Sequence, residues 1–414
     1  MKKPRISTAQ KTLFLLMISA ISLLLGLSYV VASDDSLFLE VPDSAVLKED
    51  ASVAQARRVK INWSLLENIK STPIDINLFD GTIITAVHEH TYQSTANEGY
   101  VWTGYVVGED NSVVTLSVVE DILVGSIILN GIEQYTIGFD GQWQVLRQID
   151  ANKIKTFAGS DSLIPPLNGD RDLNQSDLCE DGSRVDLLIA YTTAARIQEG
   201  GTAVIEALLN NRVANMNWAN ESSGLSFKYR LVHTMESDYV ETEDVREDLD
   251  RLSGYVDRQL TDVIVARDQY LADLTSLVVS EASGDACGVA YTMNNLSTDF
   301  AYYALNVTAL DYAGPATCDP LTLAHEIGHN MGNNHNRSNT NYDPLLPYAF
   351  GYQSPYGTFR TIMAYNCPGT YCPRYNFWSN SDGHISGEPT GIDHEKDPAN
   401  SADNARSMAQ TAYY

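Results

Sequence analysis

The chain has 414 residues, of which 44% are hydrophobic and 19% are charged. This length is enough for two or three domains, and the composition is that of an ordinary globular protein, which excludes a fibrous or disordered one. The 53 acidic side chains outnumber the 27 basic ones and give a formal net charge of −26. No nucleic-acid partner is expected, because such binding needs a basic surface that displaces counterions from the phosphates.

The N-terminus has the layout of a secretory signal peptide. Four basic residues lie within the first eleven positions, and residues 12–32 then run without a charge and end with small residues at Val30 and Ala32. We therefore predict a signal peptide at 1–32 and a secreted protein, extracellular or periplasmic in transit, with no stable membrane association after signal cleavage. The apolar run is somewhat long, so an uncleaved membrane anchor is the alternative interpretation.

Residues 33–178 are predicted to form a β-rich domain. A short helical candidate lies within 49–69, and residues 74–149 contain β-branched and aromatic runs separated by turn sequences. This pattern is typical of a meander or sandwich of five to seven strands. Residues 159–183 lack periodicity and are rich in Pro, Gly, Asn, Asp and Ser, so we expect an exposed connector that serves as a processing site.

From residue 185 the pattern alternates between strands and helices. Helical spacing covers 201–222 and, with an interruption near Gly254, 242–272. Strand-like runs occupy 185–192, 225–235, 274–280, 288–293 and 302–310. We predict an α/β (α+β) domain with a twisted mixed sheet, spanning 179–414.

The segment "LTLAHEIGHNMGNNHN", residues 321–336, holds three of the eight histidines. Asp319 and Pro320 before it are a helix start signal, with an N-cap acceptor and a proline at the first helical position. On such a helix, His325 and His329 are four residues apart and lie on one face.

Gly332 is a natural stop for this helix, because glycine adopts the left-handed geometry that reverses the chain. His335, three residues later, can then face the same point as the two helical histidines. Three imidazoles make three corners of a tetrahedral zinc site and leave the fourth for water. Partly buried polar packing is the alternative, but this pattern with Glu326 inside it arises by chance in only about one in 10⁵ chains of this size.

The motif H-E-x-x-H-x-x-G-x-x-H resembles that of the metzincin zinc endopeptidases, whose name refers to a methionine turn beneath the metal. The sequence "FRTIMAYNC" supplies such a turn at Met363. Together with "CGVAYTM" and "NCPGTYCPRYNFWSN", the motifs look most like bacterial reprolysin/adamalysin-like enzymes, in particular the peptidyl-Asp metalloendopeptidases. The resemblance covers residues 185–414.

The resemblance implies one catalytic Zn²⁺ on His325, His329 and His335, with Glu326 as general base for hydrolysis of internal peptide bonds. It also implies that protein or peptide substrates lie extended along a sheet edge near residues 288–293.

Two arginines close to the Met-turn are candidates for the substrate pocket. Arg360 lies just before the turn and Arg374 follows it. Either can pair with an acidic side chain next to the cut, and ordinary surface arginines are the alternative.

Two positions depart from the adamalysin pattern. Asn336 follows the third histidine, where an aspartate is usual, and Tyr365 stands two residues after the Met-turn methionine. That spacing is similar to astacins and serralysins, in which the tyrosine ligates zinc or stabilises the transition state. Packing beneath the site is the alternative role for Tyr365.

The chain has five cysteines, so at least one has no partner within the chain. Cys367 and Cys372 flank a tight loop that a disulfide can close, and a Cys287–Cys318 bond would anchor the active-site helix to the sheet. Cys179 is left over. It is either a zymogen switch that occupies the open zinc position or an unpaired or differently bridged cysteine.

We therefore predict a secreted zinc-dependent endopeptidase made as a zymogen, with residues 33–178 as propeptide. The alternative is a catalytically silent metzincin-fold binding protein, although such proteins usually lose the glutamate or a histidine. The acidic run at 236–248 lacks EF-hand spacing and leaves calcium undecided. The sequence gives no prediction for oligomeric state.

Overall fold

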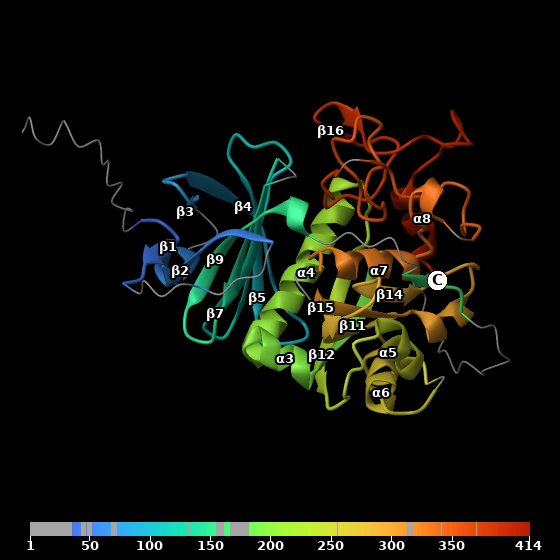
Figure 1. Ribbon diagram of the computed structural model, residues 1–414, viewed down its shortest axis with the longest axis horizontal. Helices are drawn as coiled ribbons and strands as arrows, with labels where there is room; N and C mark the ends of the chain where they lie inside the picture. The colour runs from blue at the N-terminus through green and yellow to red at the C-terminus, as the bar shows by residue number, and fades with distance from the viewer. Residues whose placement is uncertain are drawn as a thin grey trace, which may run out of the picture.

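The computed structural model describes residues 35–42, 47, 52–67, 73–130, 133–154, 161–165, 182–254, 256–312, 318–340, 342–369 and 371–414. They form an N-terminal β unit and a C-terminal α/β unit that lie side by side (Figure 1). The predicted signal peptide, most of the predicted connector and Cys179 fall outside the described residues. Within the described ranges, no helix is long and apolar enough to cross a membrane.

The N-terminal unit is one antiparallel sheet in the order β1-β2-β9-β8-β7-β6-β5-β4-β3. A bridge between Ser36 and Asp75 joins the two edges, so the sheet curls almost into a barrel around its own apolar core. Residues 74–149 form seven strands, within the five to seven predicted there, and β1 and β2 precede them: β1 Phe38–Glu40, β2 Val53–Ile61, β3 Ile74–Asn77, β4 Ile83–Gln93, β5 Tyr100–Val106, β6 Val113–Val119, β7 Ile122–Leu129, β8 Glu133–Phe139 and β9 Gln144–Ile149.

The helical candidate at 49–69 is wrong for most of its length. Its first half is β2, which pairs with β1 on one side and β9 on the other. Val59 and Ile61 are buried on either side of the exposed Lys60, and this alternation fits a strand with one buried face. Only α2, Trp63–Glu67, is helical.

The α/β unit is built on a six-stranded mixed sheet in the order β10-β14-β15-β13-β11-β12. Four strands are parallel, whereas β14 runs antiparallel to β15, and β10 pairs in parallel with β14 at the sheet edge. The strands are β10 Ser162–Leu163, β11 Arg184–Thr192, β12 Lys228–Ser237, β13 Leu274–Ala282, β14 Gly288–Tyr291 and β15 Leu305–Tyr312.

The helices of this unit lie against the sheet. Helices α4 and α7 share one face and α5 and α6 lie on the other (Figure 1). The C-terminal region after α7 is mostly irregular. The elements are α3 Thr193–Glu199, α4 Thr202–Ser222, α5 Val245–Leu252, α6 Thr261–Tyr270, α7 Thr322–Asn330, the hairpin β16 His384–Ile385 and β17 Glu388–Pro389, α8 Asn404–Thr411, and the 3₁₀ turns Ala151–Lys153, Thr298–Tyr303 and Arg337–Asn339.

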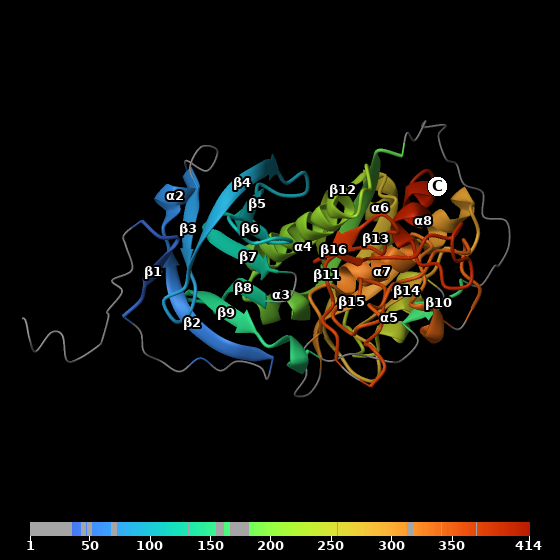
Figure 2. The same cartoon turned by 90° about the horizontal axis from the view of Figure 1, so that it is seen from above.

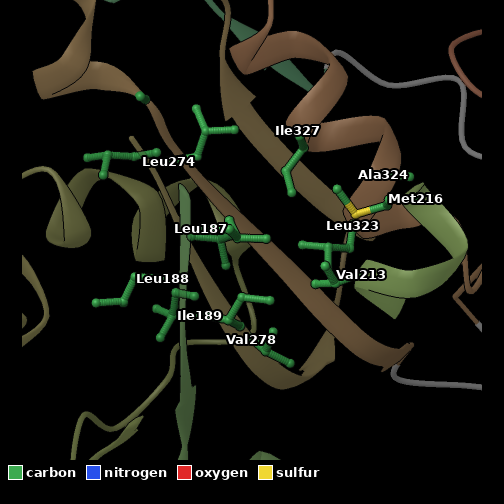
Figure 3. Close-up of a cluster of buried hydrophobic side chains, with 14 of the residues drawn as sticks. Leu187, Leu188, Ile189, Val213, Met216, Leu274, Val278, Leu323, Ala324 and Ile327 are labelled. Atoms are coloured by element: carbon green, nitrogen blue, oxygen red, sulfur yellow. The ribbon is translucent and has the colours of Figure 1, made fainter. Parts of the chain in front are cut away.

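The main apolar core fixes the position of α7. Figure 3 shows Leu323 and Ile327 of α7 beside Leu187 of β11 and Val213 of α4. These four side chains are at most 4% exposed, so burying them holds the helix on the sheet by the hydrophobic effect. The other side of α7 is left to face the C-terminal region.

The β unit docks on α4. Val119 and Val124 pack against Val204 and Ala207 of that helix. Next to this contact, a row of α4 asparagines bonds the sheet: Asn211 Nδ2 donates to the Thr115 carbonyl (3.0 Å), and Asn215 accepts from the Thr115 hydroxyl (2.8 Å) and donates to Ser126 (2.9 Å).

One short piece of the predicted connector is not exposed. Asp161 and Ser162 are 7% and 6% exposed, and Ser162 begins β10 at the edge of the six-stranded sheet (Figure 2). The composition suggested an exposed linker, but strand addition buries these residues regardless of their polarity.

Candidate metal centre

Helix α7 begins slightly later than predicted. The Asp319 carboxylate accepts from the Leu321 N–H (2.9 Å) and its carbonyl accepts from the Thr322 N–H (2.9 Å). Asp319 and Pro320 therefore form a turn just before the helix rather than its cap and first residue.

Two histidines project from α7 away from the apolar core. His325 and His329 are one helical turn apart and only 2% and 0% exposed. Their rings meet edge to face, with centroids 4.9 Å apart. The side-by-side placement is the one that the four-residue spacing predicts.

The turn after α7 depends on Gly332. Its φ is +78°, and its N–H donates to the His329 carbonyl (2.9 Å). A Cβ at this position would also lie 2.5 Å from Leu345 Cδ2. Only glycine fits here without strain, and the reversal that it allows brings His335 back against the α7 histidines.

The three imidazoles meet at their Nε2 atoms. His335 Nε2 lies 3.0 Å from His329 Nε2 and 3.2 Å from His325 Nε2. Nitrogen ligands about 2.0–2.1 Å from a tetrahedral zinc ion are about 3.3 Å apart. The separations of the three nitrogens thus fit three corners of one metal site.

The other ring nitrogens set the tautomers. His325 Nδ1 lies 2.9 Å from the Ile362 carbonyl and His329 Nδ1 lies 2.9 Å from the Asn333 carbonyl. His335 Nδ1 is 3.3 Å from the Asn339 carbonyl. A carbonyl only accepts, so each Nδ1–H donates and each Nε2 keeps a lone pair for a metal.

A carboxylate from the connector completes the cluster. Asp161 Oδ1 lies 2.7 Å from His335 Nε2 and 3.7 Å from His329 Nε2, and Oδ2 lies 3.4 Å from His325 Nε2. One ligand atom from each of these four buried residues lies within 4.8 Å of the others. Three imidazoles and one carboxylate are a donor set suited to zinc.

Glu326 lies beside this cluster and is 1% exposed. Its Oε2 has no hydrogen-bond partner among the described residues. The other carboxylate oxygen approaches β14 so closely that a Cβ on Gly288 would lie 2.7 Å from it. Glu326 is therefore held between α7 and the sheet edge with one oxygen available as an acceptor.

The Met-turn lies beneath α7. A Cβ on Gly328, between the two helical histidines, would lie 2.3 Å from Met363 Sδ. Two residues on, the Tyr365 hydroxyl donates to Asp161 Oδ1 (2.8 Å), and its N–H donates to Asn336 Oδ1 (3.0 Å). Asn336, which departs from the adamalysin pattern, thus ties the third-histidine loop to the Met-turn.

The two candidate pocket arginines have different surroundings. Both line a cavity of about 30 Å³ together with Glu326 and Asp161. Arg360 is 2% exposed and donates to the carbonyls of Cys372 (3.1 Å) and Ala364 (2.7 Å), which is a structural role.

Arg374 is the more available of the two. Its Nη1 pairs with Asp319 Oδ2 at 3.3 Å, and its buried Nε has no hydrogen-bond partner within the described part of the chain. Of the two arginines, Arg374 is thus the one with a side-chain N–H that has no hydrogen-bond partner among the described residues.

Two disulfides brace the site. Cys287, just before β14, is bonded to Cys318, just before α7, and Cys367 is bonded to Cys372 after the Met-turn. Both pairings are those the sequence predicted. The structure gives no position for Cys179.

Burial dominates the electrostatics of the cluster. It lowers the pKa of His325 to about 3 and also lowers that of His329, so both imidazoles stay neutral. Burial, reinforced by the Asp161 charge, raises the pKa of Glu326 well above its usual range.

Together, the mixed sheet, the helix with two histidines and the methionine beneath it define a metal-dependent peptidase unit. Residues 181–379 match the model of a reprolysin-like family described as "Metallo-peptidase family M12". This part of the chain is therefore similar to the reprolysin-like metallopeptidases of that family.

The relatives found carry one activity in their names. The chain is 30% identical over 228 residues to a peptidyl-Asp metalloendopeptidase of Xanthomonas campestris pv. campestris, a match that covers 54% of this chain and 49% of that protein. It is 28% identical over 300 residues to a peptidyl-Asp metalloendopeptidase of Stenotrophomonas maltophilia (strain R551-3), covering 70% and 66% of the two chains. The chain thus spans about half to two thirds of the length of these relatives.

A solved structure, metalloproteinase-II from Bacteroides fragilis, superposes with a TM-score of 0.40 at 13% identity, covering 66% of this chain and 84% of that one.

Sequence reasoning missed Asp161. It is one of 53 acidic residues and sits in a polar stretch with no motif around it. A short apolar run after it, Leu163 and Ile164, was the only local sign of a strand. Nothing in the sequence links it to histidines so distant in the chain.

Proposed function

We propose that the chain is a zinc-dependent endopeptidase, exported from the cell and made as an inactive precursor, that prefers acidic residues next to the cut. The observation that supports this most strongly is the convergence of three Nε2 lone pairs beside the buried carboxylate of Glu326. Similarity to a metallopeptidase family agrees with it. Export is supported by the signal-like sequence at 1–32.

His325, His329 and His335 would hold a zinc ion, which would supply Lewis acidity and lower the pKa of a water molecule towards about 7. Glu326 takes a proton from the attacking water through its available carboxylate oxygen and later returns it to the leaving amine. The water oxygen bonds to the carbonyl carbon, the C–N bond breaks, and no covalent acyl-enzyme forms. The Tyr365 hydroxyl, which donates to Asp161 in the full chain, would donate to the developing oxyanion once it is released from that contact.

The acidic preference is proposed to depend on Arg374. This side chain lines the cavity beside Glu326 with an unpartnered Nε. A charge-assisted bond from it to a substrate carboxylate contributes about 1.5–3 kcal/mol, or roughly 10- to 100-fold in selectivity. The names of the relatives, peptidyl-Asp metalloendopeptidases, point to the same residue class.

The test compares the wild-type protein with Glu326→Ala after the full chain has been cleaved with trypsin and both the trypsin and the released N-terminal β unit have been removed. We expect the wild type to cleave peptides, to lose that activity when a chelator is added and to regain it when zinc is restored. We expect Glu326→Ala to bind zinc but to cleave no peptide. A trimmed, zinc-loaded wild type that cleaves nothing in a broad peptide library would establish the alternative, a silent binding protein.

Selectivity is tested separately, on paired peptides that differ only by Asp or Asn next to the cut. We expect Arg374→Ala to lower kcat/KM for the Asp peptide at least 10-fold and to leave the Asn peptide nearly unchanged. Arg196→Ala is the matched control, because this arginine is on the surface and pairs with Glu236. An unchanged Asp-to-Asn ratio in Arg374→Ala would eliminate this arginine as the selector.

A further inference from the structure

We propose that Asp161 is the fourth metal ligand of the full-length chain, and that residues 161–163 form a built-in inhibitor seated in the cleft. This inference rests on the proposed function, because it needs the three histidines to bind a metal. In an active zinc peptidase the fourth coordination position of the metal is open for water. We infer that in the full-length chain Asp161 fills that position.

The carboxylate is placed where the remaining ligand belongs. Its two oxygens face the three Nε2 atoms at 2.7 Å (His335), 3.4 Å (His325) and 3.7 Å (His329). Asp161 is 7% exposed, and burying an acidic side chain requires a partner that repays its desolvation. A cation shared with three neutral imidazoles is such a partner.

A second contact orients the carboxylate. The Tyr365 hydroxyl donates to Asp161 Oδ1 at 2.8 Å. The Tyr365 ring also lies against His335, with centroids 4.1 Å apart. Tyr365, two residues after the Met-turn methionine, therefore orients the aspartate, much as outer hydrogen bonds hold other metal-binding carboxylates.

The segment also occupies the edge expected for substrate. The Ala290 N–H donates to the Asp161 carbonyl (2.9 Å), and the Thr292 N–H donates to the Leu163 carbonyl (2.8 Å). These bonds make β10 an added strand on β14. The backbone donors that would bind an extended peptide are thus already used.

The same geometry explains why the segment is not itself cut. The group that faces the histidines is a side-chain carboxylate, which has no amine leaving group. The backbone carbonyls of Asp161 and Leu163 point to the amides of β14 instead. Residues 161–163 therefore bind as an inhibitor rather than as a substrate.

This assignment makes Cys179 unnecessary for latency. A thiolate switch would have to enter the position that the Asp161 carboxylate fills. The proposal therefore predicts that Asp161, and not Cys179, keeps the precursor inactive.

Access to the metal provides a readout that is independent of catalysis. The full-length chain is prepared with Glu326→Gln, so that it stays uncut, and is loaded with Co²⁺. Acetohydroxamate is then titrated while the visible absorption of the cobalt is followed. We expect no spectral change in the protein that keeps Asp161. When Asp161→Ala or Asp161→Asn is combined with Glu326→Gln, we expect acetohydroxamate to bind the cobalt saturably.

The asparagine variant keeps the size of the side chain, so loss of folding does not explain its result. Asp121→Asn, a change at an exposed turn between β6 and β7, is the matched control and should remain closed to the probe. Equal binding of acetohydroxamate with and without Asp161 would overturn the inference. Absence of bound Co²⁺ in every variant, measured by equilibrium dialysis, would instead refute the proposed metal site itself.

A second arm measures latency with Glu326 intact. We expect untrimmed Asp161→Asn to cleave a peptide substrate at least 10-fold faster than the untrimmed wild type, and Cys179→Ala to remain as inactive as the wild type. The opposite pattern, in which only Cys179→Ala gains activity, would assign latency to the cysteine and overturn the role of Asp161.

Discussion

Gly328 is where the metal-binding helix meets the Met-turn, and replacing it with alanine tests that packing. Gly328 lies between the two α7 histidines, and an added Cβ would lie 2.3 Å from Met363 Sδ and 3.0 Å from Trp378 Cζ3. Met363 and Trp378 are both 0% exposed. Neither side chain has solvent into which it can move, so the new methyl group must displace the helix or the turn.

Two effects oppose each other in this substitution. Alanine is favoured over glycine inside a helix by about 1 kcal/mol. Forcing an extra methyl group into a filled core costs about 1–3 kcal/mol. The contact to Met363 Sδ would be more than 1 Å too short, so we expect a cost towards the upper end of that range. We therefore expect Gly328→Ala to lower the free energy of unfolding by about 1–2 kcal/mol and to weaken zinc binding, because the displaced helix carries two ligands.

The assay is urea unfolding of the metal-free protein, together with zinc competition against a chromophoric chelator. The double variant Gly328→Ala/Met363→Ala supplies the control. Met363→Ala alone should cost about 2–5 kcal/mol through its cavity, and the new methyl group should fill part of that space. The double variant should thus be more stable than the sum of the single changes by about 0.5–3 kcal/mol.

A more stable Gly328→Ala protein with unchanged zinc affinity would show that the gain in helix propensity exceeds the cost of overpacking. The described contact between Gly328 and Met363 would then be wrong. Strict additivity in the double variant would contradict the same contact by an independent route.

Two further predictions concern pH and the disulfides. Burial lowers the pKa of His325 from 6.5 to about 3, so below pH 6.5 the unfolded chain binds a proton that the folded chain does not. The unfolding free energy of the metal-free protein should then fall by about 1.4 kcal/mol per pH unit from this residue as the pH drops from 6.5 towards 4.5. His325→Asn keeps a donor for the Ile362 carbonyl and should show a shallower pH slope in urea titrations, whereas an equal slope would contradict the burial. Replacing Cys287 and Cys318 with alanine should cost about 4 kcal/mol, against about 2 kcal/mol for the Cys367–Cys372 pair, because the closed loops span 31 and 5 residues. Equal urea midpoints for the two disulfide variants would refute that ranking.

Much of the metal site could be predicted because its signals are local. His325, His329 and His335 fall within eleven residues, and helix periodicity plus the left-handed Gly332 are enough to bring them together. The alternation of strands and helices likewise predicts a mixed sheet with helices on it. The helical candidate at 49–69 was wrong because backbone pairing with β1 and β9, which are distant in the sequence, makes residues 53–61 a strand.

The location of Asp161 in the site could not be predicted, because it is set by contacts with residues that are distant in the sequence. It precedes its partner Tyr365 by 204 positions. Its burial comes from the backbone donors of β14, which any extended segment can use. The surrounding composition, rich in residues typical of loops, suggested solvent exposure, and pairing at the sheet edge overrode it. Side-chain identity alone does not reveal such a contact.

Under the proposed function, the docking of the β unit on α4 has a consequence for how the precursor would mature. A single cut between Leu163 and Arg184 leaves Asp161 covalently attached to the N-terminal β unit. That unit stays hydrogen-bonded to the asparagines of α4. The severed strand then rebinds as a tethered ligand, at an effective concentration on the order of millimolar. Scission alone would produce a two-chain, still silent complex, and the irreversible event would be departure or digestion of the whole barrel.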